Sequence, residues 1–127
     1  MRERHLFEYT VIRVIPRVER GEFLNVGVIV YCQPHEFLRA ACEVDERRFA
    51  AFGREVEVAE IEGHLRSIEK ICAGGNGSGP IGKLSKGERF RWLTAPRSTI
   101  VQTSSVHSGL CIDPNETLKD LMEKLVR

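Results

Sequence analysis

The chain has 127 residues, close to the commonest size of a single domain, with 19 basic and 18 acidic side chains. A composition of 42% hydrophobic and 29% charged residues is that of a globular protein and excludes disorder along most of the chain. The net charge of +1 excludes binding of polyanions by net charge alone, and no apolar run reaches the ~18 residues of a membrane span. The charged residues 1–5 do not open a signal peptide. We therefore expect one α+β domain over residues 1–127, cytoplasmic and without membrane attachment.

Charge is distributed unevenly along the chain. Residues 43–62 have a net charge of −4, whereas residues 83–97 have a net charge of +4. This pattern predicts one acidic and one basic region, and a basic face suits an anionic partner. Two solvated surfaces without a partner explain the same pattern equally well.

Three runs rich in β-branched and aromatic residues open the chain and predict strands over residues 6–15, 23–32 and 36–44. Gly21 marks a turn between the first two, and the short connection makes them an antiparallel hairpin. The second run is apolar on both faces, which predicts a central position in the sheet. Asp45 then caps a short helix that Gly53 ends.

Helical periodicity dominates the second half of the chain. Apolar residues at helical spacing predict a long helix over 56–72, followed by a glycine-rich loop over 73–80. A short helix over 85–94 and short strands over 98–103 and 106–112 come next. Asp113 caps the last helix, with Pro114 in its first position. The predicted fold class is α+β: an antiparallel sheet of four to five strands packed by two main helices plus short helices.

Cysteines and histidines give no sign of a metal site or a cofactor. The four cysteines include no C-x-x-C pair, so we expect free thiols in a reducing compartment. The four histidines lack the paired spacing of zinc ligands. We expect neither metal nor cofactor, and only a site assembled in space, for instance from Cys32 and His35, stays open.

Two further motifs carry weak chemical signals. Residues 77–83 (GSGPIGK) match the start of a nucleotide-binding loop, but Leu84 replaces its hydroxyl residue and the loop leaves a helix rather than a strand. A flexible loop is the better interpretation. Serines and His107 gather in residues 98–108 without a nucleophile elbow, so hydroxyl-rich strands and turns are favoured over a catalytic pair.

A polar cluster interrupts the first hairpin. Arg13 lies within an apolar strand, and a charge there costs several kcal/mol unless it is paired. An ion pair between Arg13 and Glu22 is the structural interpretation. The functional alternative is an anion or carboxylate clamp built from Arg13 and Asn25.

Basic and aromatic residues alternate in residues 88–98 (ERFRWLTAPRS). This alternation suits single-stranded nucleic acid or phosphate recognition. Packing of the aromatic residues in the core, with the arginines in solvent, is the structural alternative. The candidate binding residues are Arg91, Trp92, Arg97 and Ser98.

Several of these segments together resemble a known family. The similar segments are residues 9–16 (YTVIRVIP), 20–28 (RGEFLNVGV), 90–99 (FRWLTAPRST), 106–111 (VHSGLC) and 113–114 (DP). They resemble the bacterial domain-of-unknown-function family 3037 over nearly the whole chain. The resemblance implies a stand-alone bacterial cytoplasmic protein with no established activity. It also implies an accessory role beside a HipA-like kinase, an association rather than a mechanism.

The hairpin cluster and the Arg/Trp segment coincide with the two family landmarks. We therefore hypothesise one shared surface, made of Arg13, Glu22, Asn25, Arg91, Trp92, Arg97 and Ser98.

Three functions follow from the sequence. The first is a non-catalytic interaction module that binds a protein, with the HipA-like kinase as its partner. The second is a nucleic-acid or phosphate-ligand binder that uses the basic surface. The third is a small enzyme acting on a phosphorylated substrate through Arg13, Glu22 and His107. Whether the chain is an enzyme, and whether it self-associates, stays open.

Overall fold

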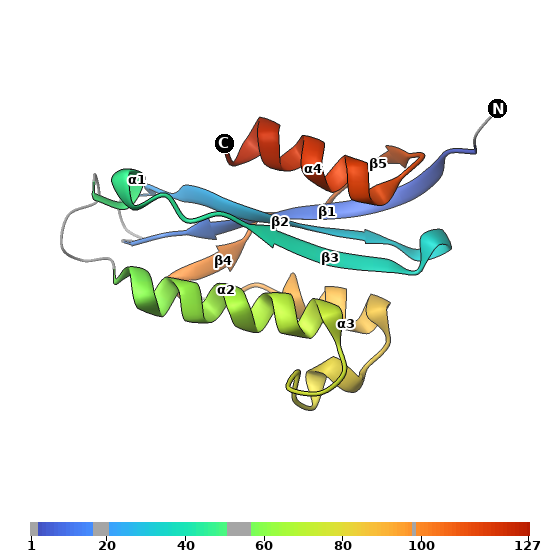
Figure 1. The fold of residues 1–127 in the computed structure, drawn as a ribbon, viewed down its shortest axis with the longest axis horizontal. Helices are drawn as coiled ribbons and strands as arrows, with labels where there is room; N and C mark the ends of the chain where they lie inside the picture. Colours follow the sequence, from blue (N-terminus) through green and yellow to red (C-terminus); the bar gives the residue numbers. More distant parts are fainter. Residues whose placement is uncertain (1–2, 17–20, 51–56, 98) are drawn as a thin grey trace.

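A computed structural model describes residues 3–16, 21–50, 57–97 and 99–127. It contains a five-stranded antiparallel sheet in the order β3-β2-β1-β4, with β5 also pairing with β1 (Figure 1). The strands are β1 (His5–Val14), β2 (Leu24–Cys32), β3 (Phe37–Cys42), β4 (Val101–Thr103) and β5 (His107–Cys111). The helices are α1 (Glu46–Ala50), α2 (Val58–Ala73), α3 (Lys86–Leu93) and α4 (Pro114–Leu125). The predicted α+β class is confirmed.

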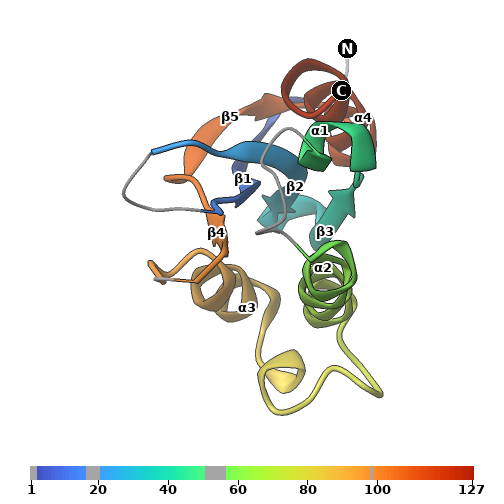
Figure 2. The same cartoon turned by 90° about the vertical axis from the view of Figure 1, so that its left-hand side faces the viewer.

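The sheet is the middle of three layers, with α4 on one face and α2 and α3 side by side on the other (Figures 1 and 2). Each face has its own core, because side chains alternate between the two faces along a strand. Ile29 packs under α2 and α3, whereas Val28 and Val30 pack under α4. This explains why β2 is apolar on both faces. None of the helices in the described ranges is both long and apolar enough to cross a membrane.

A β-bulge changes the pairing of the first hairpin. Ile12 lies opposite Gly27, but the next pair is Arg13 with Asn25, so Val26 is the extra residue on β2. Gly27 is required there, since a Cβ atom would lie 2.6 Å from the carbonyl oxygen of Ala41. The extra residue therefore places Asn25 opposite Arg13, on the same face of the sheet.

Ser104 joins β4 and β5 into one edge along β1. Its backbone N–H donates to the Val11 carbonyl at 2.8 Å, and its Oγ accepts the Val11 N–H at 2.9 Å. The hydroxyl of the buried Thr10 donates to the Ser104 carbonyl at 2.7 Å. This serine, from the group considered as a nucleophile, completes strand pairing instead.

A side chain of α3 caps the C-terminal end of α2, where the glycine-rich loop begins. Arg89, a buried residue of α3, donates from Nη1 to the carbonyls of Ile71 and Cys72 at 2.8 and 2.9 Å. Gly74 has a φ of 71°, and a Cβ atom there would lie 2.7 Å from Arg89 Nη1. Ser78 is buried and donates to the Gly75 carbonyl. Residues 71–74, just before the segment that resembled a nucleotide-binding loop, thus contact an arginine that satisfies the helix end.

Candidate functional site

The predicted site residues lie on opposite faces of the sheet. Arg13 and Asn25 are opposed across β1 and β2, so they project on the same face, and Asn25 contacts α4. Arg91 and Trp92 belong to α3, which covers the other face. The hypothesis of one shared surface is therefore wrong. Ser98, its seventh member, lies outside the described residues.

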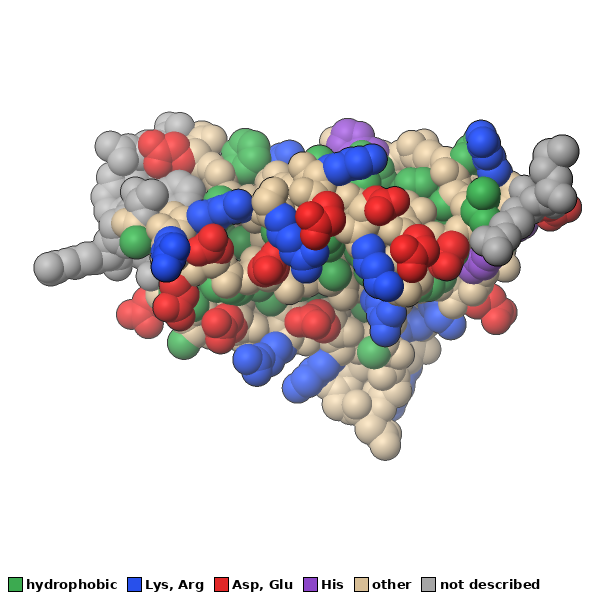
Figure 3. All heavy atoms as spheres, turned by 45° about the horizontal axis from the view of Figure 1, so that its top comes forward, with side chains coloured by type: hydrophobic (Ala, Val, Ile, Leu, Met, Phe, Trp, Pro, Cys, Tyr) green, Lys and Arg blue, Asp and Glu red, His purple; other side chains and the backbone are tan. Residues whose placement is uncertain are grey.

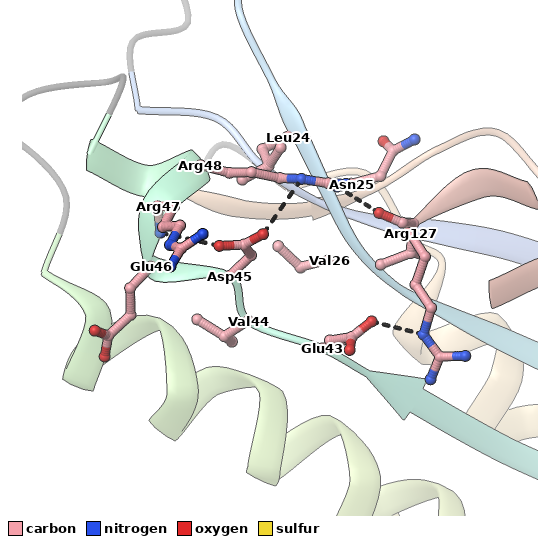
Figure 4. A pocket seen from close by; sticks show the side chains of 11 residues that line it. Leu24, Asn25, Val26, Glu43, Val44, Asp45, Glu46, Arg47, Arg48 and Arg127 are labelled. Atoms are coloured by element: carbon pink, nitrogen blue, oxygen red, sulfur yellow. Dashed lines mark hydrogen bonds and ion pairs between the residues drawn. The ribbon is translucent and has the colours of Figure 1, made fainter. Parts of the chain in front are cut away.

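Asn25 lines a pocket of about 510 Å³ beside the C-terminal end of α4 (Figure 4). Its Nδ2 donates to the Leu125 carbonyl at 2.9 Å, and Arg48 Nη1 donates to the Val126 carbonyl. The last carbonyls of a helix have no partner within the helix, so these two side chains satisfy them. Asn25 acts as a helix cap, a role that the sequence analysis did not predict.

The charges of this pocket are largely paired with one another. Arg127 Nε lies 2.8 Å from Glu43, and Arg48 Nε lies 3.6 Å from Asp45. Acidic and basic side chains are likewise intermingled over the α4 side of the molecule (Figure 3). This side therefore offers no uniform field to an anionic ligand.

Arg13 is not paired with Glu22. Its guanidinium lies over the ring of Phe23, 4.3 Å from the centroid, whereas Glu22 is exposed. No ion pair joins the two among the described residues, so the predicted structural pair is wrong. The Asn25 amide, which the clamp hypothesis assigns to a ligand, already donates to α4.

The three groups of the enzyme hypothesis do not converge. Arg13 and Tyr9 lie four residues apart on β1, and His107 is opposite Tyr9, with ring centroids 5.3 Å apart. Four residues of a strand span roughly 13 Å. A single phosphoryl group cannot contact both Arg13 and His107 across that span.

Two of the three arginines in residues 83–97 have partners on other elements of the fold, one in the interior and one on the surface. Arg89 caps α2, as described above. Arg91 makes a bidentate ion pair with Glu8, at 2.8 and 2.7 Å, and this hydrogen bonding raises the pKa of the Arg91 guanidinium. Of the five basic side chains in residues 83–97, only Lys83, Lys86 and Arg97 then remain to contact the phosphates of a nucleic acid.

Trp92 and Arg97 are brought together at the junction of α2, α3 and β4. The Arg97 guanidinium lies 3.9 Å from the centroid of the Trp92 ring and donates from Nη2 to the Trp92 carbonyl. They line a cavity of about 220 Å³, which we call the α2–α3 notch; its other lining residues are His64, Ser67, Ile68, Ile71, Thr99 and Val101. Trp92 is 38% exposed, so part of the ring is available to a partner.

The described part of the chain contains no group of three or more metal-ligating side chains. All four cysteines are free thiols, and burial raises the pKa of Cys42 and of Cys72 to about 12. Thiols are then protonated at neutral pH and are poor nucleophiles. Neither of these two thiols is therefore a candidate nucleophile.

Comparison with known proteins places the chain in a family without assigning an activity. No curated protein and no solved structure matches it. A family model described as "Protein of unknown function (DUF3037)" matches residues 9–126, nearly the whole chain, including β2, β1 from Tyr9 onward and the Arg/Trp segment. The chain belongs to this family.

Proposed function

We propose that this protein is a non-catalytic interaction module that binds a protein partner through the α2–α3 notch. One observation carries the proposal: a partly exposed Trp92, held beneath Arg97, at the edge of a cavity with an apolar floor. Tryptophan and arginine are the residue types most enriched in the energetic centres of protein interfaces.

The arrangement also lowers the cost of binding. Arg97 restricts the ring through its stacking and through the bond to the Trp92 carbonyl, so less side-chain freedom is lost when a partner covers it. Ile68, Ile71 and Val101 provide an apolar floor for a side chain of the partner. Ser67 adds a hydroxyl group to the lining, whereas the Thr99 hydroxyl donates to the Val101 carbonyl within the chain. A lining of apolar and polar residues together is usual in an interface.

The HipA-like kinase that the family resemblance implies is the partner to test. Both purified proteins would be mixed and run on size-exclusion chromatography, with affinities from calorimetry. We expect co-elution, and Trp92→Ala should weaken binding by about 30-fold or more, the loss typical of an interface hot spot.

Leu84→Ala is the matched control, because Leu84 is also 38% exposed but precedes α3 rather than ending it. Its affinity should match that of the unmodified chain. Separate elution at micromolar concentrations would reject the proposal. Equal affinity of the Trp92→Ala variant would reject the notch as the binding surface.

A further inference from the structure

The end of the sheet beyond α3 exposes an apolar pair. Leu6 of β1 and Leu110 of β5 lie directly opposite each other and are 59% and 62% exposed. Ile112, two residues further along the same edge, is also exposed. Directly opposed side chains lie about 5 Å apart, so the two leucines form one continuous apolar surface.

The outer edge of β5 has free backbone hydrogen-bonding groups. Both backbone groups of Val11 point toward Ser104, on the β4–β5 side of β1. Backbone direction alternates along a strand, so Tyr9 and Phe7 point the same way and bond with His107 and Gly109. Ser108 and Leu110 must then point outward, and no other described strand pairs with β5.

This edge lacks the usual protection against pairing. Exposed edge strands normally carry charged residues, especially lysine, or proline. Residues 106–112 (VHSGLCI) contain neither Lys, Arg, Asp, Glu nor Pro. A second copy of the same edge would meet no like charge, whereas a charged partner segment would find no opposite charge.

We propose that a second copy of this chain pairs its β5 with this edge in antiparallel orientation, with Leu110 opposite the second copy's Leu110. Both residues point their backbone groups outward, so this register forms a hydrogen-bonded pair on the two-fold axis. Ser108 then lies opposite the second copy's Ile112.

The same register gives a continuous apolar row across four strands. Leu6, Leu110 and their two equivalents in the second copy occupy successive strands on one face. Side chains that are exposed in one copy are thereby covered in the dimer. The proposal is independent of the notch, which is lined by α2, α3 and β4.

Sedimentation equilibrium of the full chain tests the proposal directly. We expect a concentration-dependent species of twice the 14.4 kDa mass. Leu110→Lys places two like charges opposite each other and should weaken dimerisation by at least about 100-fold. Leu84→Lys, a change at another exposed leucine, should leave the dimer intact.

A charge exchange tests the register. Leu110→Lys and Leu110→Glu should each be monomeric, and an equimolar mixture should restore a dimer because opposite charges now face each other. Circular dichroism would confirm that both variants are folded. Hydrogen exchange of the unmodified chain gives a readout without mutation: the Ser108 and Leu110 amides should lose protection on dilution.

A monomer at all concentrations up to the millimolar range would overturn the proposal. A dimer that persists in Leu110→Lys, or amides of Ser108 and Leu110 that exchange equally at high and low concentration, would overturn the β5 pairing.

Discussion

The pocket at the C-terminal end of α4 and the α2–α3 notch are both lined by arginine but use it differently. In the pocket, Asn25 and Arg48 donate to the last carbonyls of α4. In the notch, Arg97 stacks on Trp92 and leaves part of the ring exposed. The pocket is the larger, about 510 against 220 Å³, yet its capping side chains and most of its charged groups already have partners within the fold. Size is therefore a poorer guide to a binding site than the partners that its residues already have.

The largest expected effect is at Arg89, the arginine of the basic segment that is buried in the fold. Arg89→Met should lower the free energy of unfolding by about 3 kcal/mol, because two carbonyls at the end of α2 lose their donor in a buried site. Urea unfolding measures the change. Lys86→Met, an exposed change in the same helix, should stay within about 0.5 kcal/mol. Equal losses in the two variants would show that Arg89 does not act as a cap.

The next largest expected effect is a pH dependence of stability, caused by the buried thiols of Cys42 and Cys72. Cys42 and Cys72 have a pKa of about 12 in the folded protein against 9.0 ordinarily. Between these values the unfolded chain loses the protons first, so stability falls as pH rises above 9, by up to about 1.4 kcal/mol per pH unit for each thiol.

Urea unfolding at pH 8 and pH 10 measures this dependence. The Cys72→Val variant should show a shallower decline between the two pH values than the unmodified chain. The same decline in both would mean that the Cys72 thiol ionises equally in the folded and unfolded states.

A smaller effect separates Asn25 from Glu22, two of the three site residues predicted in the hairpin. Asn25→Ala should cost about 1 kcal/mol, since the Leu125 carbonyl loses its hydrogen bond. Glu22→Ala should change stability by less than about 0.5 kcal/mol, because Glu22 is exposed and has no ion pair with Arg13. Thermal unfolding of both variants provides the comparison. A greater cost for Glu22→Ala would restore the pairing that the sequence suggested.

Arg97→Ala gives the smallest change in stability, about 0.5 kcal/mol, because its stacking on Trp92 is exposed. Its effect should appear in the exposure of Trp92 instead. The chain has one tryptophan, so acrylamide quenching of fluorescence reports on this ring alone. Quenching should increase in Arg97→Ala, and unchanged quenching would indicate that Arg97 does not cover the ring.

The elements of this fold were largely predictable, because they depend on local patterns. Runs rich in β-branched and aromatic residues marked β1 and β2, and Asp113 marked the start of α4, where its side chain accepts the Asn115 N–H. One local signal in the sequence was missed, the S-x-x-E signature of Ser85 and Glu88, which forms a capping box at α3.

The arrangement of the candidate site was not predictable in the same way. The bulge opposite Ile12 and Arg13 decides which face Asn25 occupies, and it depends on contact between Gly27 and a third strand. The roles of Arg89 and Asn25 depend on helix ends far away in sequence, at Cys72 and Leu125. Residue types alone therefore suggested one shared surface, whereas the fold places the hairpin residues and the Arg/Trp segment on opposite faces of the sheet.

The most direct test of the account is acrylamide quenching of Trp92 in the presence of the HipA-like kinase, using a kinase variant without tryptophan. A partner bound at the notch covers the ring, so quenching should fall as the kinase is added and saturate at the stoichiometry of the complex. The Leu84→Ala variant should behave identically. A complex that forms while Trp92 remains as readily quenched as in the free chain would contradict the account.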